Sequence, residues 1–105
     1  MFASGEKVAE FPELSPNHIE KLCTIAEEAA RQHILSRVPA KFVEKLDVTV
    51  EVEGSGPLTL AVEVELTLSP IMQYIDVEKL AEEAVKEAFT SAENYLRELK
   101  CPMRK

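Results

Sequence analysis

The sequence predicts a small α+β domain, a two-layer sandwich in which an antiparallel hairpin packs on two helices in the order α-β-β-α. Apolar residues alternate with polar ones over 46–53 and again over 58–68, and this period of two is typical of half-buried strands. On either side of these runs, apolar residues recur at the three- and four-residue spacing of a helix. One sheet face and one stripe on each helix must then be buried together.

The N-terminal segment, residues 1–14, shows no clear period. We expect it to be poorly ordered or to add a short strand over 7–11. Pro12 would end such a strand, because proline cannot donate to a hydrogen-bond ladder. The domain itself is expected over residues 15–99, and residues 100–105 are expected to form a C-terminal tail that frays.

The first helix has clear start and stop signals. Ser15 is a favourable N-cap, and Pro16 occupies the first helical position, where its missing N–H costs nothing. Apolar residues then form one broad stripe from Ile19 to Ile34. Because Pro39 disfavours helical backbone at the residue before it, we expect the helix to end near residue 37.

The hairpin is predicted by two alternating runs joined at Gly54-Ser55-Gly56-Pro57. One face is apolar, and the other carries several carboxylates: Glu51, Glu53, Glu63 and Glu65. Carboxylates gathered on one surface could hold a divalent cation or dock a basic partner. An open strand surface without histidine is more typical of a solvated polar face, so we predict no metal site and no cofactor.

The second helix begins after Asp76, whose side chain caps it, and Glu78 complements the helix dipole in the first turn. Pro102 marks its limit. Small residues recur along one flank: Ala81, Ala84, Ala88 and Ala92. They permit close approach of another helix, or they pack on the hairpin of their own chain.

The predicted hairpin has two edge strands, and a lone two-stranded sheet is marginally stable. The run over 58–68 is long for a strand and contains no Pro or Lys to block pairing. A strand from the N-terminal segment, from a second copy or from another protein could pair with the free edge of this strand. We favour a symmetric homodimer. The interface candidates are Leu58, Leu60, Val62, Val64, Ala84, Ala88 and Ala92.

Composition narrows the class of protein. The net charge of −7, from 19 acidic and 12 basic side chains, argues against a general nucleic-acid binder. Apolar runs fall short of the ~20 residues that span a bilayer, and the N-terminus does not resemble a secretory signal, so we expect a cytoplasmic protein without membrane contact. Abundant Glu beside few Asn and Gln is typical of thermophiles. The spacing of Cys23 and Cys101 leaves open whether they pair.

Sequence motifs for catalysis are missing, although catalytic groups can converge from distant positions. We therefore expect a non-enzymatic assembly or adaptor protein, acting as a homodimer or as a subunit of a small complex. The alternative is an RNA-associated accessory factor that uses a basic patch of Arg31, Arg37, Lys41 and Lys45 beside Phe42. Cations also favour a helix C-terminus for electrostatic reasons alone. His18 and His33 lack partners at ligand spacing, so boundary positions are expected for both.

Three segments carry a resemblance to a known family: SPNHIEKLCTIAEEAARQHILSRVP, the hairpin LDVTVEVEG…LTLAVEVELTLS, and DVEKLAEEAVKEAFTSAENYLREL. Together, over roughly residues 13–99, they resemble small archaeal proteins of unknown function with a helix–hairpin–helix plan. The genes of that family often lie beside those for a prefoldin subunit and a small KEOPS subunit. The chain is also similar in layout to the small dimerising subunit of KEOPS, a tRNA-modifying complex, which has an additional N-terminal strand. Neither resemblance implies catalytic residues.

Overall fold

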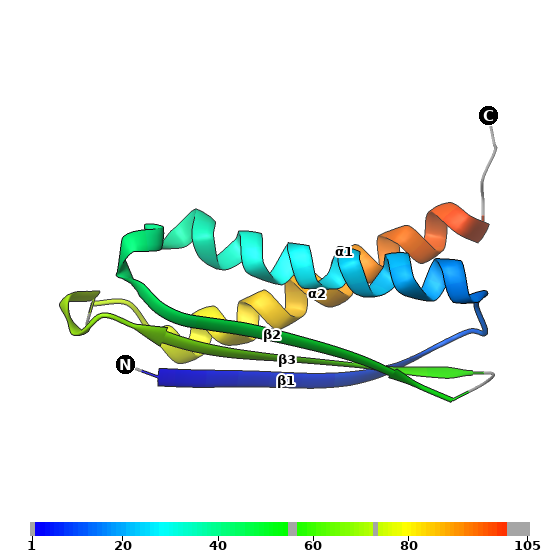
Figure 1. The fold of residues 1–105 in the computed structure, drawn as a ribbon, viewed down its shortest axis with the longest axis horizontal. Coiled ribbons are helices and arrows are strands. Elements are labelled where there is room, and N and C mark those ends of the chain that lie inside the picture. The colour runs from blue at the N-terminus through cyan, green and yellow to red at the C-terminus, as the bar shows by residue number, and fades with distance from the viewer. Residues whose placement is uncertain (1, 55–56, 73, 101–105) are drawn as a thin grey trace.

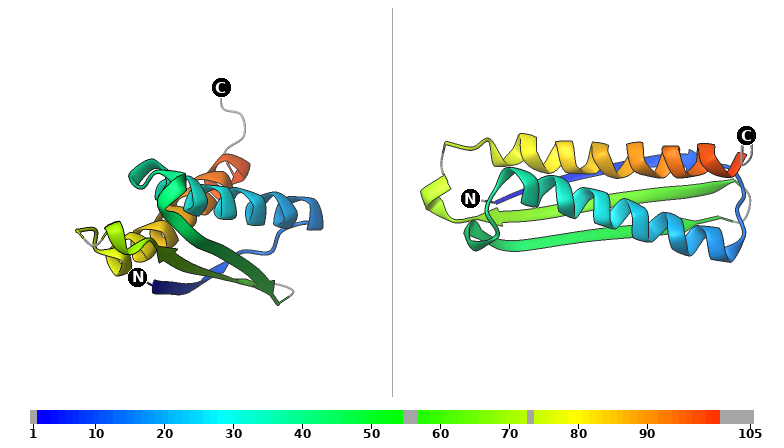
Figure 2. Two further views of the ribbon diagram at one scale, coloured as in Figure 1. Left: turned by 60° about the vertical axis from the view of Figure 1, so that its left-hand side comes forward. Right: turned by 90° about the horizontal axis from the view of Figure 1, so that it is seen from above.

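Two helices cover one face of a three-stranded sheet in the computed structural model, which describes residues 2–54, 57–72 and 74–100 (Figure 1). The elements in chain order are β1 (Phe2–Phe11), α1 (Pro16–Arg37), β2 (Val43–Glu53), β3 (Leu58–Leu68) and α2 (Val77–Lys100). Short 3-10 helices, Ala40–Phe42 and Pro70–Met72, precede β2 and follow β3. Seen from above, the helices run antiparallel, with α1 toward β2 and α2 toward β1 (Figure 2). The α+β class and the two layers are therefore confirmed.

The N-terminal segment forms a full strand, which corrects the predicted element order. All ten residues of β1 pair antiparallel with β3, from Phe2 opposite Thr67 to Phe11 opposite Leu58. The sheet order is β1-β3-β2, and the chain runs β-α-β-β-α. The strand over residues 58–68 is therefore central and not an edge.

Both helices begin where their capping residues predict. The Ser15 side chain accepts a hydrogen bond from the backbone N–H of His18 at 3.4 Å, and Pro16 is the first residue of α1. Asp76 accepts one from the backbone N–H of Lys79 at 3.1 Å. These caps satisfy backbone donors that a helix leaves unpaired in its first turn.

The predicted hairpin of β2 and β3 is confirmed, with Val48 opposite Val64. Strand β2 begins earlier than the alternation indicates, and a bulge between Val43 and Lys45 shifts its register. Gly54 opens the turn with φ 98°, a conformation that favours glycine. Residues 55–56 of the predicted turn and 101–105 of the predicted tail lie outside the described residues.

The core lies between β3 and the helices. Every second side chain of β3 is buried there: Leu58, Leu60, Val62, Val64, Leu66 and Leu68. The sheet comes close to α2 at Gly5, where an added Cβ would lie 3.1 Å from the carbonyl oxygen of Ala81. Small residues on both elements thus let β1 sit directly beneath α2.

Candidate functional site

The seven predicted interface residues lie inside the core of a single chain. Leu58, Leu60, Val62 and Val64 point from the central strand toward the helices, and the alanines at 84, 88 and 92 are fully buried on α2. The premise of a free edge at 58–68 is wrong, because β1 occupies that edge. The alanines therefore pack within their own chain, which is one of the two alternatives stated above.

Strands β1 and β2 are the two edges of the sheet, and β2 is the edge whose apolar inward-facing side chains stay partly exposed. Among the described residues it pairs with β3 alone, so its other side presents unpaired backbone groups. Its inward-facing side chains are only half-buried: Leu46, Val48, Val50 and Val52. Beyond the bulge and Lys45, the stretch over 46–53 contains no Pro, no Lys and no inward-facing charge. Natural edges usually carry such features to prevent association.

The outer face of the sheet bears no helix and is strongly acidic (Figure 1). The strand register sets Glu6 of β1 opposite Glu63, and Asp47 of β2 opposite Glu65. The strand register does not set two members of the predicted quartet directly opposite each other, since Glu51 faces Ala61 and Glu53 faces Thr59, but Glu51 and Glu63 line one small hollow together with Glu6. No group of three or more His, Cys, Asp or Glu in the described part of the chain is arranged to hold a metal ion.

The four residues of the predicted basic patch do not form one surface, because two are ion-paired and the others lie at different places. Arg31 donates to Glu27 at 3.0 Å, and Lys45 pairs with Asp47 at 3.5 Å on the outer face of the sheet. Lys41 lies 5.2 Å above the ring of Phe42. Arg37, at the end of α1, adjoins Glu83 of α2.

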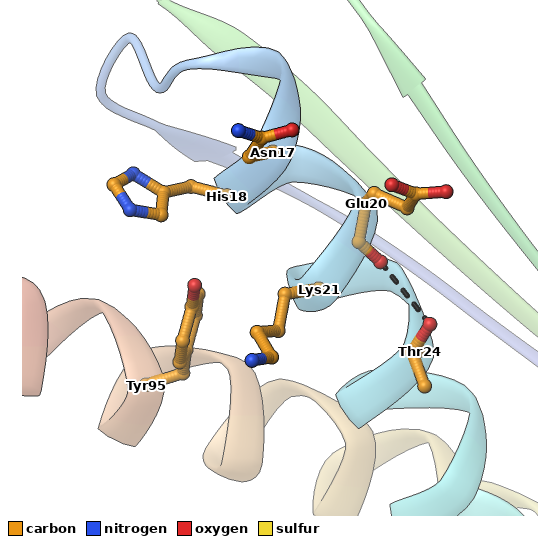
Figure 3. Close-up of a pocket in the computed structure, with 6 residues that line it drawn as sticks. All are labelled: Asn17, His18, Glu20, Lys21, Thr24 and Tyr95. Carbon is orange, nitrogen blue, oxygen red and sulfur yellow. Dashed lines mark hydrogen bonds between the residues drawn. The ribbon is translucent and has the colours of Figure 1, made fainter.

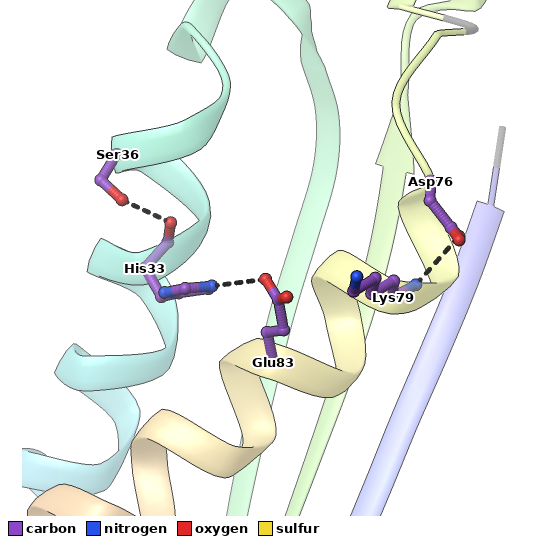
Figure 4. Close-up of polar contacts among 5 residues, drawn as sticks. All are labelled: His33, Ser36, Asp76, Lys79 and Glu83. Carbon is purple, nitrogen blue, oxygen red and sulfur yellow. Dashed lines mark hydrogen bonds and ion pairs between the residues drawn. The ribbon is translucent and has the colours of Figure 1, made fainter.

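A polar contact joins α1 and α2 (Figure 4). Nε2 of His33 lies 3.2 Å from a carboxylate oxygen of Glu83. The hydrogen bond from His33 holds the pKa of Glu83 below its ordinary value, and the charges of His33, Arg37 and Lys79 add to the effect. Sequence reasoning missed this pair, because its members are far apart in the chain.

An open hollow of roughly 570 Å³ lies between the start of α1 and the end of α2 (Figure 3). Its lining is polar, and the rings of His18 and Tyr95 meet edge to face with centroids 6.4 Å apart. The side chain of Lys21 extends toward Tyr95, whereas Thr24 bonds the backbone oxygen of Glu20 at 3.2 Å. The hollow brings together neither a nucleophile and base nor a set of metal ligands.

The thiol of Cys23 is free and half-buried on α1, and burial raises its pKa. A raised pKa lowers the thiolate fraction at neutral pH, which does not suit a reactive cysteine. Cys101 lies outside the described residues. Helices in the described ranges are not long and apolar enough to cross a membrane.

A family described as protein of unknown function (DUF3194) matches residues 11–95 of this chain. The chain belongs to this family. An uncharacterized protein of Thermococcus kodakarensis, TK0644, is 30% identical over 101 residues, which are 94% of this chain and 93% of that protein. The uncharacterized protein PF0383 of Pyrococcus furiosus is 32% identical over 84% of this chain and 78% of its own length. The family resemblance predicted from the sequence is thus confirmed as one to uncharacterised archaeal proteins.

Two solved structures share the fold of this DUF3194 protein. A crystal structure from Thermococcus onnurineus has a TM-score of 0.77 at 29% identity, and the match covers 96% of this chain and 99% of that one. The solution structure of the hypothetical protein mth677 from Methanothermobacter thermautotrophicus has a TM-score of 0.67 at 28% identity, over 81% and 91%. These matches place the fold among archaeal proteins.

Proposed function

We propose that this protein is a non-enzymatic assembly subunit, which pairs through the β2 edge as a homodimer or within a small complex. The observation that carries the proposal is the strip of half-buried apolar side chains beside an unpaired strand edge. A partner strand at this edge would satisfy the backbone groups and cover Val48 and Val50.

The layout of the chain supports a role in a complex. The small dimerising subunit of KEOPS, to which the sequence is similar in plan, has an N-terminal strand before its helix and hairpin. Strand β1 supplies that strand here, so the element orders now correspond. This correspondence supports pairing with a chain of similar layout, and it rests on topology alone.

A lysine at an inward-facing position of β2 tests the proposal. Val50→Lys places a charge where the partner strand would seat its apolar side chains, so the variant is expected to lose its partner. Thr49→Lys, which adds the same charge on the outer face, is the matched control. Light scattering and native affinity purification measure the assembly, and circular dichroism checks that both variants fold.

A monomeric wild-type protein that retains no other chain in native purification would refute the assembly role. Equal losses in Val50→Lys and Thr49→Lys would place the contact elsewhere, since only the first changes the apolar side of β2.

A role as an RNA-associated accessory factor is the second candidate. The exposed Lys41 beside Phe42 favours it, because a cation next to an aromatic ring suits contact with phosphates and bases. Since Arg31 and Lys45 are ion-paired, Arg37 and Lys41 are the residues to test. Charge reversal at both should weaken a salt-sensitive RNA mobility shift, and a wild-type protein that gives no shift at low salt would remove this candidate.

A further inference from the structure

We infer that the occupant of the β2 edge is a second copy of this chain, paired antiparallel about a two-fold axis that passes through Val48. This inference rests on the proposed function, because it requires that the β2 edge be used. It adds the identity of the partner and the register of pairing. The two sheets would become one continuous sheet, with the helices of both copies on the same face.

The apolar side of β2 is self-complementary in this register. Val48 meets Val48 of the second copy, and Leu46 meets Val50 in both directions. Each of these side chains is half-buried in the single chain and would be covered in the pair. Registers displaced by one residue would set apolar positions opposite polar ones, which the period of two in a strand forbids.

Charge on the outer side favours this register over those with the axis at Thr49 or at Asp47. With the axis at Val48, Lys45 lies opposite Glu51 of the second copy, and Asp47 lies opposite Thr49. Both contacts occur twice because of the symmetry. An axis at Thr49 would instead set Asp47 against Glu51, and an axis at Asp47 would set that carboxylate against itself. Like charges directly opposite each other destabilise a sheet.

The bulge limits the pairing on one side. It lies between Val43 and Lys45, so the regular part of β2 starts at Lys45. Pairing from Lys45 to Glu51 therefore uses the straight stretch of the strand and ends at its own two charged residues. Lys45 therefore supports pairing instead of preventing it, because Glu51 of the second copy lies opposite.

Cysteine cross-linking in a Cys23→Ala, Cys101→Ala background tests the register. Val48→Cys should form a disulfide-linked dimer under mild oxidation, because a residue on the axis meets its own copy within bonding distance. Thr49→Cys and Val50→Cys should not, since each faces a different residue. A dimer linked through Thr49→Cys but not through Val48→Cys would overturn the register.

A charge swap separates a second copy from a different partner. Lys45→Glu should raise the dimer dissociation constant roughly tenfold, since it sets four carboxylates at the seam. Adding Glu51→Lys restores opposite charges only if the same chain stands on both sides, so the double variant should recover wild-type association in sedimentation equilibrium. Failure of this rescue overturns the inference. The inference is also overturned if the wild-type protein does not self-associate but binds a different chain that the Val50→Lys variant releases, although the proposed function would then stand.

Discussion

The two edges of the sheet are built in different ways. On β1 the inward-facing positions before Phe11 are small or charged, and Lys7 points toward the helices with its amino group 5.3 Å from the ring centroid of Phe89. On β2 the inward-facing positions are Leu and Val, and they remain half-buried. An inward-facing lysine protects an edge, because pairing there would bury its charge. The comparison teaches that side chains, and not strand length, decide which edge is open.

The cover provided by the helices differs as well. Helix α2 approaches β1 through alanines, and Ala81 comes within van der Waals contact of the position of Gly5. Helix α1 lies toward β2 and leaves its valines partly exposed. The small residues therefore let α2 cover the inner face of β1, whereas the inner face of β2 stays partly exposed.

The largest effect on stability is expected on β1, where α2 packs against Gly5. Gly5→Val introduces a branched side chain where even a Cβ would lie 3.1 Å from backbone atoms of Ala81. Such overpacking should lower the free energy of unfolding by about 1–3 kcal/mol. Urea denaturation measures it, with Ser4→Val on the outer face as control, and equal stabilities would contradict close packing of β1 on α2.

Removing the protecting charge should open the β1 edge. Lys7→Val gives β1 an apolar inward-facing residue, so we expect added self-association in sedimentation velocity at constant salt. Glu6→Val, which raises the apolar content of the same strand on its outer face, is the control. If the two variants associate equally, hydrophobicity alone and not the inward-facing charge governs this edge.

The contact between His33 and Glu83 should stabilise the fold above the ordinary pKa of a Glu side chain, and this contribution should be lost in acid. Because the pKa of Glu83 is lowered in the folded chain, its contribution is present above the ordinary value of 4.5 and is lost as the pH falls through the folded value. Glu83→Gln should therefore flatten the acid limb of a plot of melting temperature against pH. An unchanged slope between the two proteins would show that the carboxylate does not gain from its neighbours.

The smallest effect is expected on the outer face. Glu63→Gln removes a charge that lies opposite Glu6, so the free energy of unfolding should rise by roughly 0.2–1 kcal/mol at low salt, as measured by thermal unfolding. Glu53→Gln, opposite Thr59 on β3, should change little. A gain that persists at high salt would point to a cause other than charge repulsion.

The helices and the hairpin were predictable because their signals are local. Ser15 and Asp76 cap α1 and α2 as expected, and the alternation over residues 58–68 identifies β3 with its correct bounds. Strand β1 was harder to predict, because its inward-facing residues before Phe11 are Ala, Gly and Lys instead of large apolar ones. Small residues are needed there because α2 packs directly on β1, and the sequence alone does not indicate this contact.

The candidate site could not be predicted for the same reason. With β1 missing from the expected sheet, residues 58–68 seemed to form the open edge, and their side chains became interface candidates. Pairing with β1 makes that strand central and leaves β2, the other predicted edge, at the side of the sheet. The residues that matter there, Val48 and Val50, lie in a run that the sequence identifies as a strand without indicating how far a helix covers it.

By itself the sequence determined the two helices, their caps, the hairpin and the polarity of its faces, since each depends on residues a few positions apart. Tertiary structure decided which strand is central, which edge is open, and that His33 meets Glu83. These depend on distant segments coming together, and strand pairing is made by backbone groups that every residue possesses. The order of strands therefore has no local signature in the chain.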